Sequence, residues 1–191
     1  MRTRMQAIVG NTTNSLFRLF VGFPMGYEVT GAIPINIEKA VIVCNHTSNL
    51  DPFFLKMAVN CFYPQFNMYG LAKIELFRSR IMRIWMNGMQ TLPVNRKSSN
   101  QKDLQAQMFA ILEEGGTIAL FPQGTRNGTQ IQIGAYIIAS RKQVPILPVT
   151  IRYSRYGFFP RVLVRFSPLL NKAEYKDAEG LETILRDYWK L

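Results

Sequence analysis

Short apolar runs recur along the chain and predict the strands of a sheet. They occupy residues 40–44 (AVIVC), 117–121 (TIALF), 146–151 (ILPVTI) and 161–166 (RVLVRF). The first three are continuous, which is typical of strands buried on both faces of a parallel sheet. The fourth alternates, with Val162, Val164 and Phe166 on one side, so we expect it to be an edge strand.

Helical periodicity lies between these runs. Apolar side chains at i, i+4, i+7 and i+8 from Leu104 predict a helix that stops before Gly115 and Gly116. Residues 53–59 and 179–190 predict two further helices. Strands that alternate with helices indicate a single α/β domain, with a mostly parallel central sheet and helices on both faces. In such domains the functional side chains follow the carboxyl ends of the strands.

The amino-terminal segment has a different pattern, because residues 16–25 (LFRLFVGFPM) are largely apolar. This run is shorter than the roughly 18 residues of a membrane-spanning helix, and Arg18 and Pro24 interrupt it. We therefore predict that residues 1–26 form a hydrophobic helical segment and that residues 27–191 form the domain. The segment either lies in a membrane interface as an anchor or packs on the domain.

The charge of the chain narrows the choice of partners. Lys and Arg number 23 against 12 Asp and Glu, the formal net charge is +11, and no carboxylate occurs between Glu114 and Glu174. Such a chain is attracted to nucleic acid, to an anionic membrane surface or to phosphorylated substrates. The sequence has no recognisable module for reading nucleic acid, so we predict no nucleic-acid partner. For single basic residues the alternative is an ordinary solvated face.

The two cysteines point to no special chemistry. Cys44 and Cys61 lack the spacing of a metal site, and they form no disulfide framework. Cys44 lies in an apolar run and is expected to be a small core residue. A reducing compartment is therefore the default expectation.

The first candidate motif follows the run at residues 40–44 and reads NHTSNLDP, from residue 45 to residue 52. His46 is the single histidine of the chain. Asp51 before Pro52 predicts a helix start, with Asp51 as the N-cap. The loop is long enough for Asp51 to fold back onto one imidazole nitrogen, which leaves the other free to take a proton from a hydroxyl.

Other interpretations of this motif are a structural histidine and a carboxylate that only caps the helix. Ser48 lies between the two residues, and we expect its hydroxyl to brace the loop rather than to act as a nucleophile. The pattern therefore favours direct attack by a substrate hydroxyl over a covalent serine intermediate.

Three further segments suggest an anion site. Residues 121–126 (FPQGTR) run from a predicted strand into a turn at Gly124, where backbone N–H groups could approach an anion and Arg126 could bind phosphate with two hydrogen bonds. Residues 88–96 (GMQTLPVNR) form another short extended run that ends at Arg96, and Lys73 precedes a predicted helix. Both arginines could reach one phosphate. The alternative is a set of ordinary turns with surface cations.

These segments, in this order, resemble the motifs of the glycerolipid acyltransferase family, the lysophosphatidic acid acyltransferases of the PlsC type. NHTSNLD matches the family's histidine, four residues, aspartate pattern, and GMQTLPVNR resembles its run from glycine to arginine. FPQGTR matches the family's FPEGTR at all positions but one, and VPILPV at residues 144–149 resembles its proline-centred strand. The resemblance covers roughly residues 27–170.

The resemblance implies a reaction and a role for the first motif. His46 would remove the proton from the acceptor hydroxyl, and Asp51 would orient it. The family takes acyl groups from thioesters of coenzyme A or acyl carrier protein, and it needs no metal and no other cofactor. The implied product is phosphatidic acid, made from 1-acylglycerol-3-phosphate at the cytoplasmic face of a membrane by a peripheral or monotopic enzyme.

The resemblance also assigns the residues that bind the acceptor. Arg96 and Arg126, together with Lys73, would hold its phosphate. The remaining substrate-binding residues are Gln123, Gly124 and Thr125, with the backbone of the last two lining the site. The partners are therefore an anionic membrane surface, a lysophosphatidic acid-like acceptor and the acyl donor.

Two positions depart from the family pattern. Gln123 stands where the family usually has glutamate, and no lysine precedes Gly134, where the family often has one. An amide keeps an acceptor and adds donors, whereas a carboxylate only accepts. The departures motivate two alternatives: an acyltransferase for a different lysolipid, or a lipid-binding homologue with weak catalysis.

Overall fold

The computed structural model describes residues 4–17, 19, 26–31, 39–63, 66–95, 97–98, 101–124, 128, 130–156 and 158–189. Three predicted site residues, Arg96, Thr125 and Arg126, lie outside these ranges, as does most of the apolar run at residues 16–25. The boundary predicted at residue 26 falls between parts that are described and parts that are not, and it stays a prediction.

The described residues form a seven-stranded sheet in the order β1-β7-β6-β2-β5-β3-β4. The strands are β1 (Tyr27–Thr30), β2 (Val41–Cys44), β3 (Met68–Lys73), β4 (Thr91–Val94), β5 (Thr117–Leu120), β6 (Ile146–Tyr156) and β7 (Phe159–Phe166). Among these strands the neighbours run parallel, except that β6 and β7 form an antiparallel hairpin. The predicted α/β architecture with a mostly parallel sheet is confirmed.

The prediction that residues 161–166 form an edge strand was wrong. β7 lies between β6 and β1, because β1 pairs with it in parallel from Tyr27 opposite Val162 to Thr30 opposite Arg165. Val162 and Val164 are buried as a result. The four residues of β1 (YEVT) contain no apolar run, so the sequence pattern does not reveal the strand that covers β7.

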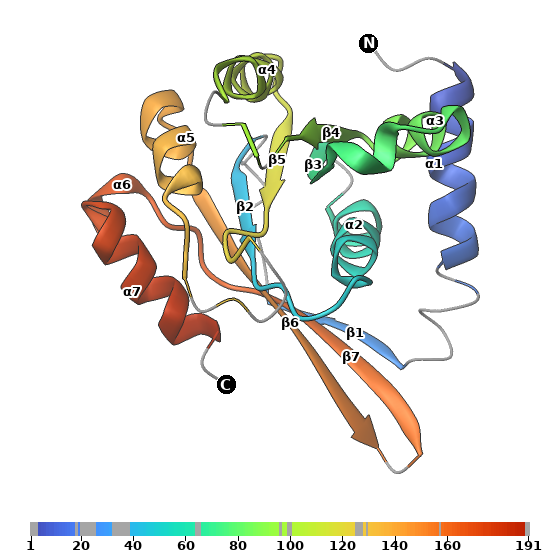
Figure 1. Cartoon of the computed structure of the whole chain (residues 1–191). Helices are drawn as coiled ribbons and strands as arrows, with labels where there is room; N and C mark the ends of the chain where they lie inside the picture. The colour runs from blue at the N-terminus through green and yellow to red at the C-terminus, as the bar shows by residue number, and fades with distance from the viewer. Residues whose placement is uncertain are drawn as a thin grey trace.

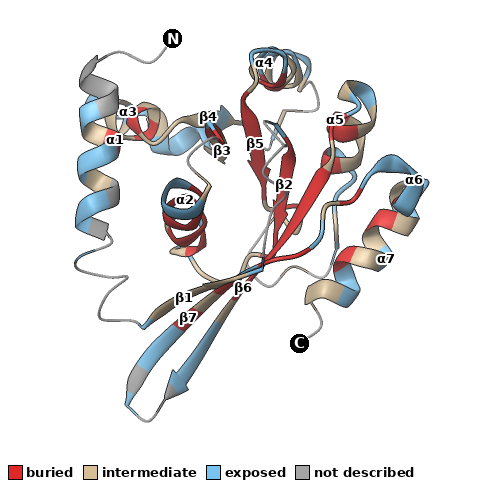
Figure 2. Ribbon diagram, turned by 180° about the vertical axis from the view of Figure 1, so that it is seen from behind, coloured by how far each residue is buried: buried red, intermediate tan, exposed pale blue. Residues whose placement is uncertain are grey.

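Helices cover both faces of the sheet (Figure 1). They are α1 (Arg4–Phe17), α2 (Asp51–Phe62), the 3-10 helix η2 (Ile74–Phe77), α3 (Arg80–Gly88), α4 (Lys102–Glu113), α5 (Gly134–Lys142), α6 (Lys172–Tyr175) and α7 (Ala178–Trp189). One core cluster joins α2 to the sheet, and a second joins α4, α5 and α7 to its other face. Figure 2 shows the buried side of these helices turned toward the buried strands β2 and β5.

The sequence patterns explain the core. β2 and β5 are buried along their whole length, as their continuous apolar runs predict. α4 ends where predicted, and Gly115 follows it with φ of +80°, a conformation that glycine adopts without steric cost. Cys44 is fully buried in the core, as expected.

The amino-terminal helix α1 packs on the domain through α3. The indole Nε1 of Trp85 donates to the hydroxyl of Thr13 over 2.9 Å, and the Trp85 ring stacks on Phe53 with centroids 5.7 Å apart. Ile8 and Leu16 on the same helix remain exposed. Among the described helices, none has the length and apolar character needed to span a bilayer.

Candidate active site

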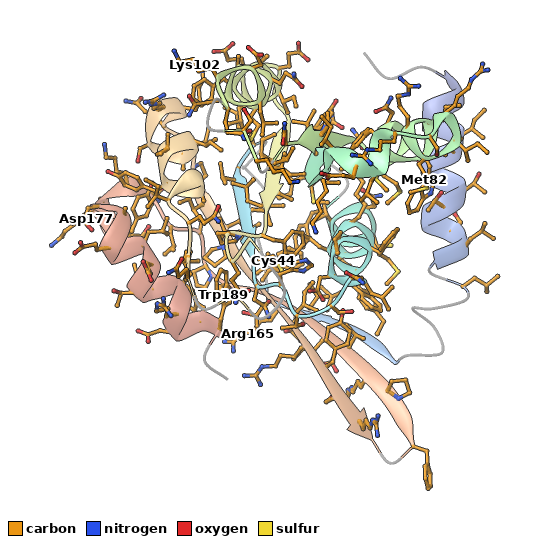
Figure 3. The ribbon with its side chains drawn as sticks, viewed as in Figure 1. Cys44, Met82, Lys102, Arg165, Asp177 and Trp189 are labelled. Carbon is orange, nitrogen blue, oxygen red and sulfur yellow. The ribbon has the colours of Figure 1, made fainter. Side chains whose placement is uncertain are left out.

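The predicted histidine motif lies at the carboxyl end of β2, in the middle of the sheet. β5 and β6 flank this strand on its two sides, and α2 begins at Asp51, directly after the loop. Cys44, labelled in Figure 3, is the last residue of β2 and marks this place near the centre of the molecule. The position fits the rule that functional loops of α/β domains follow the strands.

Asp51 is fully buried and accepts four hydrogen bonds. Its Oδ2 atom accepts from His46 Nδ1 at 2.9 Å, from the Thr47 backbone N–H at 2.6 Å and from the Ser48 backbone N–H at 2.7 Å. Its Oδ1 atom accepts from the Tyr153 hydroxyl at 2.6 Å. A buried carboxylate is costly unless donors surround it, and here both oxygens are satisfied.

The prediction that Asp51 is the N-cap of the helix was wrong. Asp51 is the first residue of α2, Leu50 precedes it in the cap position, and no side chain caps this end. The carboxylate turns toward the N–H groups of the preceding loop instead. The Ser48 hydroxyl accepts from the Leu50 N–H at 3.2 Å, so Ser48 braces the loop as expected.

The His46 ring is bound to Asp51 through Nδ1, and the residue also borders the groove. Because Nδ1 contacts an acceptor-only carboxylate, Nδ1 carries the proton and Nε2 is the acceptor. The ring packs on Phe121 with centroids 4.8 Å apart, and 17% of the His46 side chain is exposed. This tautomer can receive a proton from a hydroxyl at Nε2.

Tyr153 is a site residue that the sequence did not reveal. It lies on β6, and 102 positions separate it from Asp51 in the chain. Burial raises the pKa of its phenol well above the usual value, and the hydrogen bond to Asp51 raises the pKa further. The hydroxyl therefore stays protonated and donates to Asp51 at any ordinary pH.

Asn45 ties the same loop to β6. Its side-chain amide donates to the Ile151 carbonyl at 2.9 Å and accepts from the Ile151 N–H at 2.7 Å. The backbone pairing of β2 with β6 ends at Cys44 opposite Val149, and these two side-chain hydrogen bonds continue the connection to β6. The loop that carries His46 is thus attached to the strand that carries Tyr153.

His46 opens into a groove of about 1050 Å³. One part of the lining is apolar, including Leu104, Met108 and Ile138 from the helices α4 and α5. Another part is polar and carries the side chains of Gln101, Gln105, Gln123, Gln130 and Gln132. The groove is large enough for a long apolar chain with a polar end.

Comparison with known proteins places the chain in a family. The family model described as "Acyltransferase" matches residues 27–152, which is most of the domain. The chain belongs to the acyltransferase family. The matched region contains the His46 loop and β5 with the turn after it. It ends at residue 152, so it includes the first part of β6 and stops one residue before Tyr153.

Relatives of known name share the family. A 1-acyl-sn-glycerol-3-phosphate acyltransferase from Streptococcus pneumoniae is 27% identical over 124 residues, which cover 65% of this chain and 46% of the relative. One of the same name from Borreliella burgdorferi is 29% identical over 176 residues, which cover 83% of this chain and 68% of the relative. The chain thus spans between about half and two thirds of the length of these acyltransferases.

A solved structure has the same fold. The crystal structure of the 1-acyl-sn-glycerophosphate acyltransferase PlsC from Thermotoga maritima superposes with a TM-score of 0.72 and 19% identity, and the match covers 100% of this chain and 81% of that one. At this identity the likeness concerns the fold of the acyltransferase domain.

Gln123 braces the active-site loop of this acyltransferase-family chain. Its Oε1 atom accepts from the His46 N–H at 2.6 Å, and its Nε2 atom donates to the Gly128 carbonyl at 2.6 Å. A single amide orientation satisfies both contacts, because the first partner is a donor and the second an acceptor. A glutamate could make the first contact, but its carboxylate would face the Gly128 carbonyl.

We expect the Gln123→Glu variant to be less stable, by about 1–2 kcal/mol, because it exchanges a hydrogen bond for a contact between two acceptors. Urea denaturation would measure the free energy of unfolding. Gln130→Glu is the matched control, since it adds the same charge to the groove and leaves both hydrogen bonds of Gln123 in place. Equal stability of the Gln123 variant and the wild type would contradict the bracing role.

The turn after Gln123 depends on Gly124. This residue has φ of +67°, and a Cβ atom there would lie 2.8 Å from Gln132 Nε2. Its N–H donates to the Phe121 carbonyl at 3.1 Å and closes the turn. Gly124 lines the groove, but its N–H is already used by this hydrogen bond inside the turn. An anion could bind the N–H, as predicted, only in place of the Phe121 carbonyl.

The other predicted phosphate-binding residues are placed only in part. Lys73 is exposed at the end of β3 and is not among the described residues that line the groove. Arg96, Thr125 and Arg126 lie outside the described residues. Described neighbours of these positions, Val94 and Ser98 on one side and Gly124 and Gly128 on the other, line the same groove.

The described part of the chain brings together no group of three His, Cys, Asp or Glu side chains with the arrangement of a metal site.

For Tyr153 we expect that the Tyr153→Phe variant has a kcat about tenfold lower, because a hydrogen bond to a charged group is lost. Steady-state kinetics would show KM unchanged, since Tyr153 is not among the described residues that line the groove. Tyr63→Phe removes a comparable hydroxyl, which donates to the Gly31 carbonyl away from His46, and serves as the control. An unchanged kcat would contradict a positioning role for Tyr153.

Proposed function

We propose that this protein is an enzyme that transfers a fatty acyl group from an acyl thioester to the free hydroxyl of 1-acylglycerol-3-phosphate, giving phosphatidic acid. The observation that carries the proposal is the His46–Asp51 pair, with Nδ1 bound to a buried carboxylate and the ring bordering the groove. The relatives from Streptococcus pneumoniae and Borreliella burgdorferi are named for this acyl transfer.

The chemistry follows from the histidine tautomer. The acceptor hydroxyl gives its proton to His46 Nε2 as its oxygen attacks the thioester carbonyl carbon. The tetrahedral intermediate then collapses, the C–S bond breaks, and the departing thiolate takes the proton back from Nε2. Asp51 stabilises the imidazolium that exists between these steps, and the Thr47 and Ser48 N–H groups and Tyr153 hold Asp51 in place.

The groove suits the substrates of this reaction. Its apolar part, lined by α4 and α5, offers a place for an acyl chain away from water. Its polar part offers amide donors and acceptors in the groove that His46 also lines. The donor is a thioester of coenzyme A or of acyl carrier protein, and both carry the same reactive group.

The acceptor phosphate requires cations, and Arg96 and Arg126 with Lys73 are proposed to supply them. In the sequence these arginines follow positions that border the groove. Arginine binds phosphate through two parallel hydrogen bonds, which fixes the acceptor in one orientation. Gln123, Gly124 and Thr125 complete this side of the proposed site.

The protein is proposed to work at the cytoplasmic face of a membrane, since its acceptor is a membrane lipid. The net charge of +11 favours an anionic surface. Residues 1–26 are the proposed anchor, and the exposed Ile8, Leu16 and Leu19 support this role.

A panel of acceptors tests the function. The purified protein would receive one labelled acyl-CoA, or the matching acyl carrier protein, with 1-acylglycerol-3-phosphate, lysophosphatidylcholine or monoacylglycerol. We expect phosphatidic acid from the first and little product from the others. Faster turnover of an acceptor without a phosphate monoester would favour an acyltransferase for a different lysolipid. Absence of turnover with every donor and acceptor would overturn the enzyme proposal.

A further inference from the structure

β6 and β7 continue beyond the rest of the sheet as a two-stranded arm. Cys44, the last residue of β2, pairs with Val149, and β6 runs on to Tyr156. These seven residues at about 3.3 Å each carry β6 roughly 23 Å past β2. Over the first four of them β1 still pairs with β7, so β6 and β7 form a two-stranded arm over the last three, about 10 Å. Figure 1 shows the hairpin leaving the body of the molecule. We use the term hairpin arm for residues 154–156 and 158–161, where β6 and β7 pair only with each other among the described strands.

The arm ends in an apolar tip with basic sides. Phe158 at the turn is fully exposed, at 101% of its reference area, and Arg155 and Pro160 are exposed below it. The sequence from residue 152 to residue 165 (RYSRYGFFPRVLVR) contains four arginines and no carboxylate. One of these arginines, Arg161, pairs with Glu28 of β1.

A single exposed phenylalanine is ordinary on a protein surface, so exposure alone decides nothing. The position of Phe158 is what matters, at the far end of a hairpin that no other described element covers. A two-stranded hairpin is only marginally stable in water. Aromatic side chains flanked by arginines are the composition that suits the headgroup region of an anionic bilayer.

The direction of the arm relates it to the active site. β2 and β6 are parallel, so the arm extends from the edge of the sheet at which the His46 loop lies. The base of the arm carries Tyr153, whose hydroxyl binds Asp51. A surface touched by the tip therefore faces the edge of the sheet that carries the His46 loop.

We propose that the hairpin arm is a membrane-binding element. Phe158 enters the headgroup region of an anionic bilayer, and Arg155 binds lipid phosphates, which holds the His46 edge toward the membrane. The choice of a bilayer over an acidic carrier protein or a second copy rests on the aromatic tip, which needs an apolar medium. The lipid acceptor in this picture rests on the proposed function.

The test compares the Phe158→Ser/Arg155→Gln variant with the wild type in co-sedimentation with vesicles. The vesicles contain equimolar phosphatidylglycerol and phosphatidylcholine. We expect the dissociation constant to rise about fivefold from the lost arginine and about tenfold from the lost phenylalanine. Turnover of short-chain, water-soluble substrates should stay unchanged, because neither residue is among those that line the groove.

Phe62→Ser/Lys172→Gln is the matched control. Phe62 is 55% exposed at the far end of α2, about 17 Å along the helix from Asp51, and Lys172 begins α6. These changes remove the same kinds of group from elsewhere on the domain. We expect the control to bind vesicles like the wild type.

Several outcomes would overturn the inference. The hairpin variant could bind vesicles as tightly as the wild type, or the control could lose as much affinity as the hairpin variant. Sedimentation velocity could show that the hairpin variant loses self-association while it keeps vesicle binding, which would identify the arm as a contact between copies. A wild type without acyl transfer would overturn the proposed function instead, and the vesicle comparison would still decide the role of the arm.

Discussion

The His46→Ala variant is expected to lose acyl transfer by a factor of about 10² to 10⁴, the usual contribution of a general base. The loss should appear in kcat, measured with saturating donor and acceptor, because the chain has no other histidine and the described residues that line the groove include no Asp or Glu. The physical reason is the tautomer: Asp51 holds the proton on Nδ1, and Nε2 is the atom left to take the proton of the hydroxyl.

The same variant should remain folded and should keep its affinity for membranes. After the substitution, Asp51 Oδ2 still accepts from the Thr47 and Ser48 N–H groups, and Oδ1 still accepts from Tyr153. Circular dichroism and vesicle co-sedimentation would check this. Turnover within a factor of about two of the wild type would contradict the role of His46 as base, since a general base contributes far more.

The Asp51→Ala variant is expected to lose about 3–5 kcal/mol of free energy of unfolding, as well as activity. The change removes the fully buried carboxylate and leaves two backbone N–H groups and the Tyr153 hydroxyl, all of them partly buried, without their acceptor. Each donor that stays shielded from water after its partner is removed costs about 1–3 kcal/mol. Urea denaturation followed by circular dichroism measures the change.

Asp51→Asn is the matched variant for this prediction. Its amide oxygen can still accept from His46, Thr47 and Ser48, and the Tyr153 hydroxyl can rotate to accept from the amide nitrogen. We expect a smaller loss of stability, of about 1–2 kcal/mol, because bonds to a neutral acceptor are weaker than bonds to a carboxylate. Activity should fall strongly in both variants, since neither has the charge that stabilises the imidazolium. Equal stability of the two variants would show that the hydrogen bonds to Asp51 do not organise the loop.

Pattern and motif together predicted much of the fold. The continuous apolar runs identified β2 and β5, and the period of the apolar residues identified α4 and α7 (Ala178–Trp189) close to their observed bounds. The loop length between His46 and Asp51 was enough to predict their contact, because five positions of chain allow few other arrangements. These features depend on neighbouring residues, which is why the sequence displays them.

Long-range features escaped the patterns. β1 has four half-buried residues and exists through its pairing with β7, and this pairing makes β7 an inner strand. β6 runs five residues past its apolar stretch because β7 pairs with it beyond the core. No local property of these segments encodes the partner that extends or covers them.

The chain by itself determined the chemistry on offer: a single histidine followed by a carboxylate, a glycine turn and a basic surface without carboxylates over a long stretch. Tertiary structure decided how that chemistry is arranged. It brought Tyr153 to Asp51, and it set Gln123 between the His46 N–H and the Gly128 carbonyl. These hydrogen bonds join residues that are far apart in the chain, so they depend on which strands are neighbours in the sheet. The order of the strands is set by the packing of the whole domain and not by any local segment.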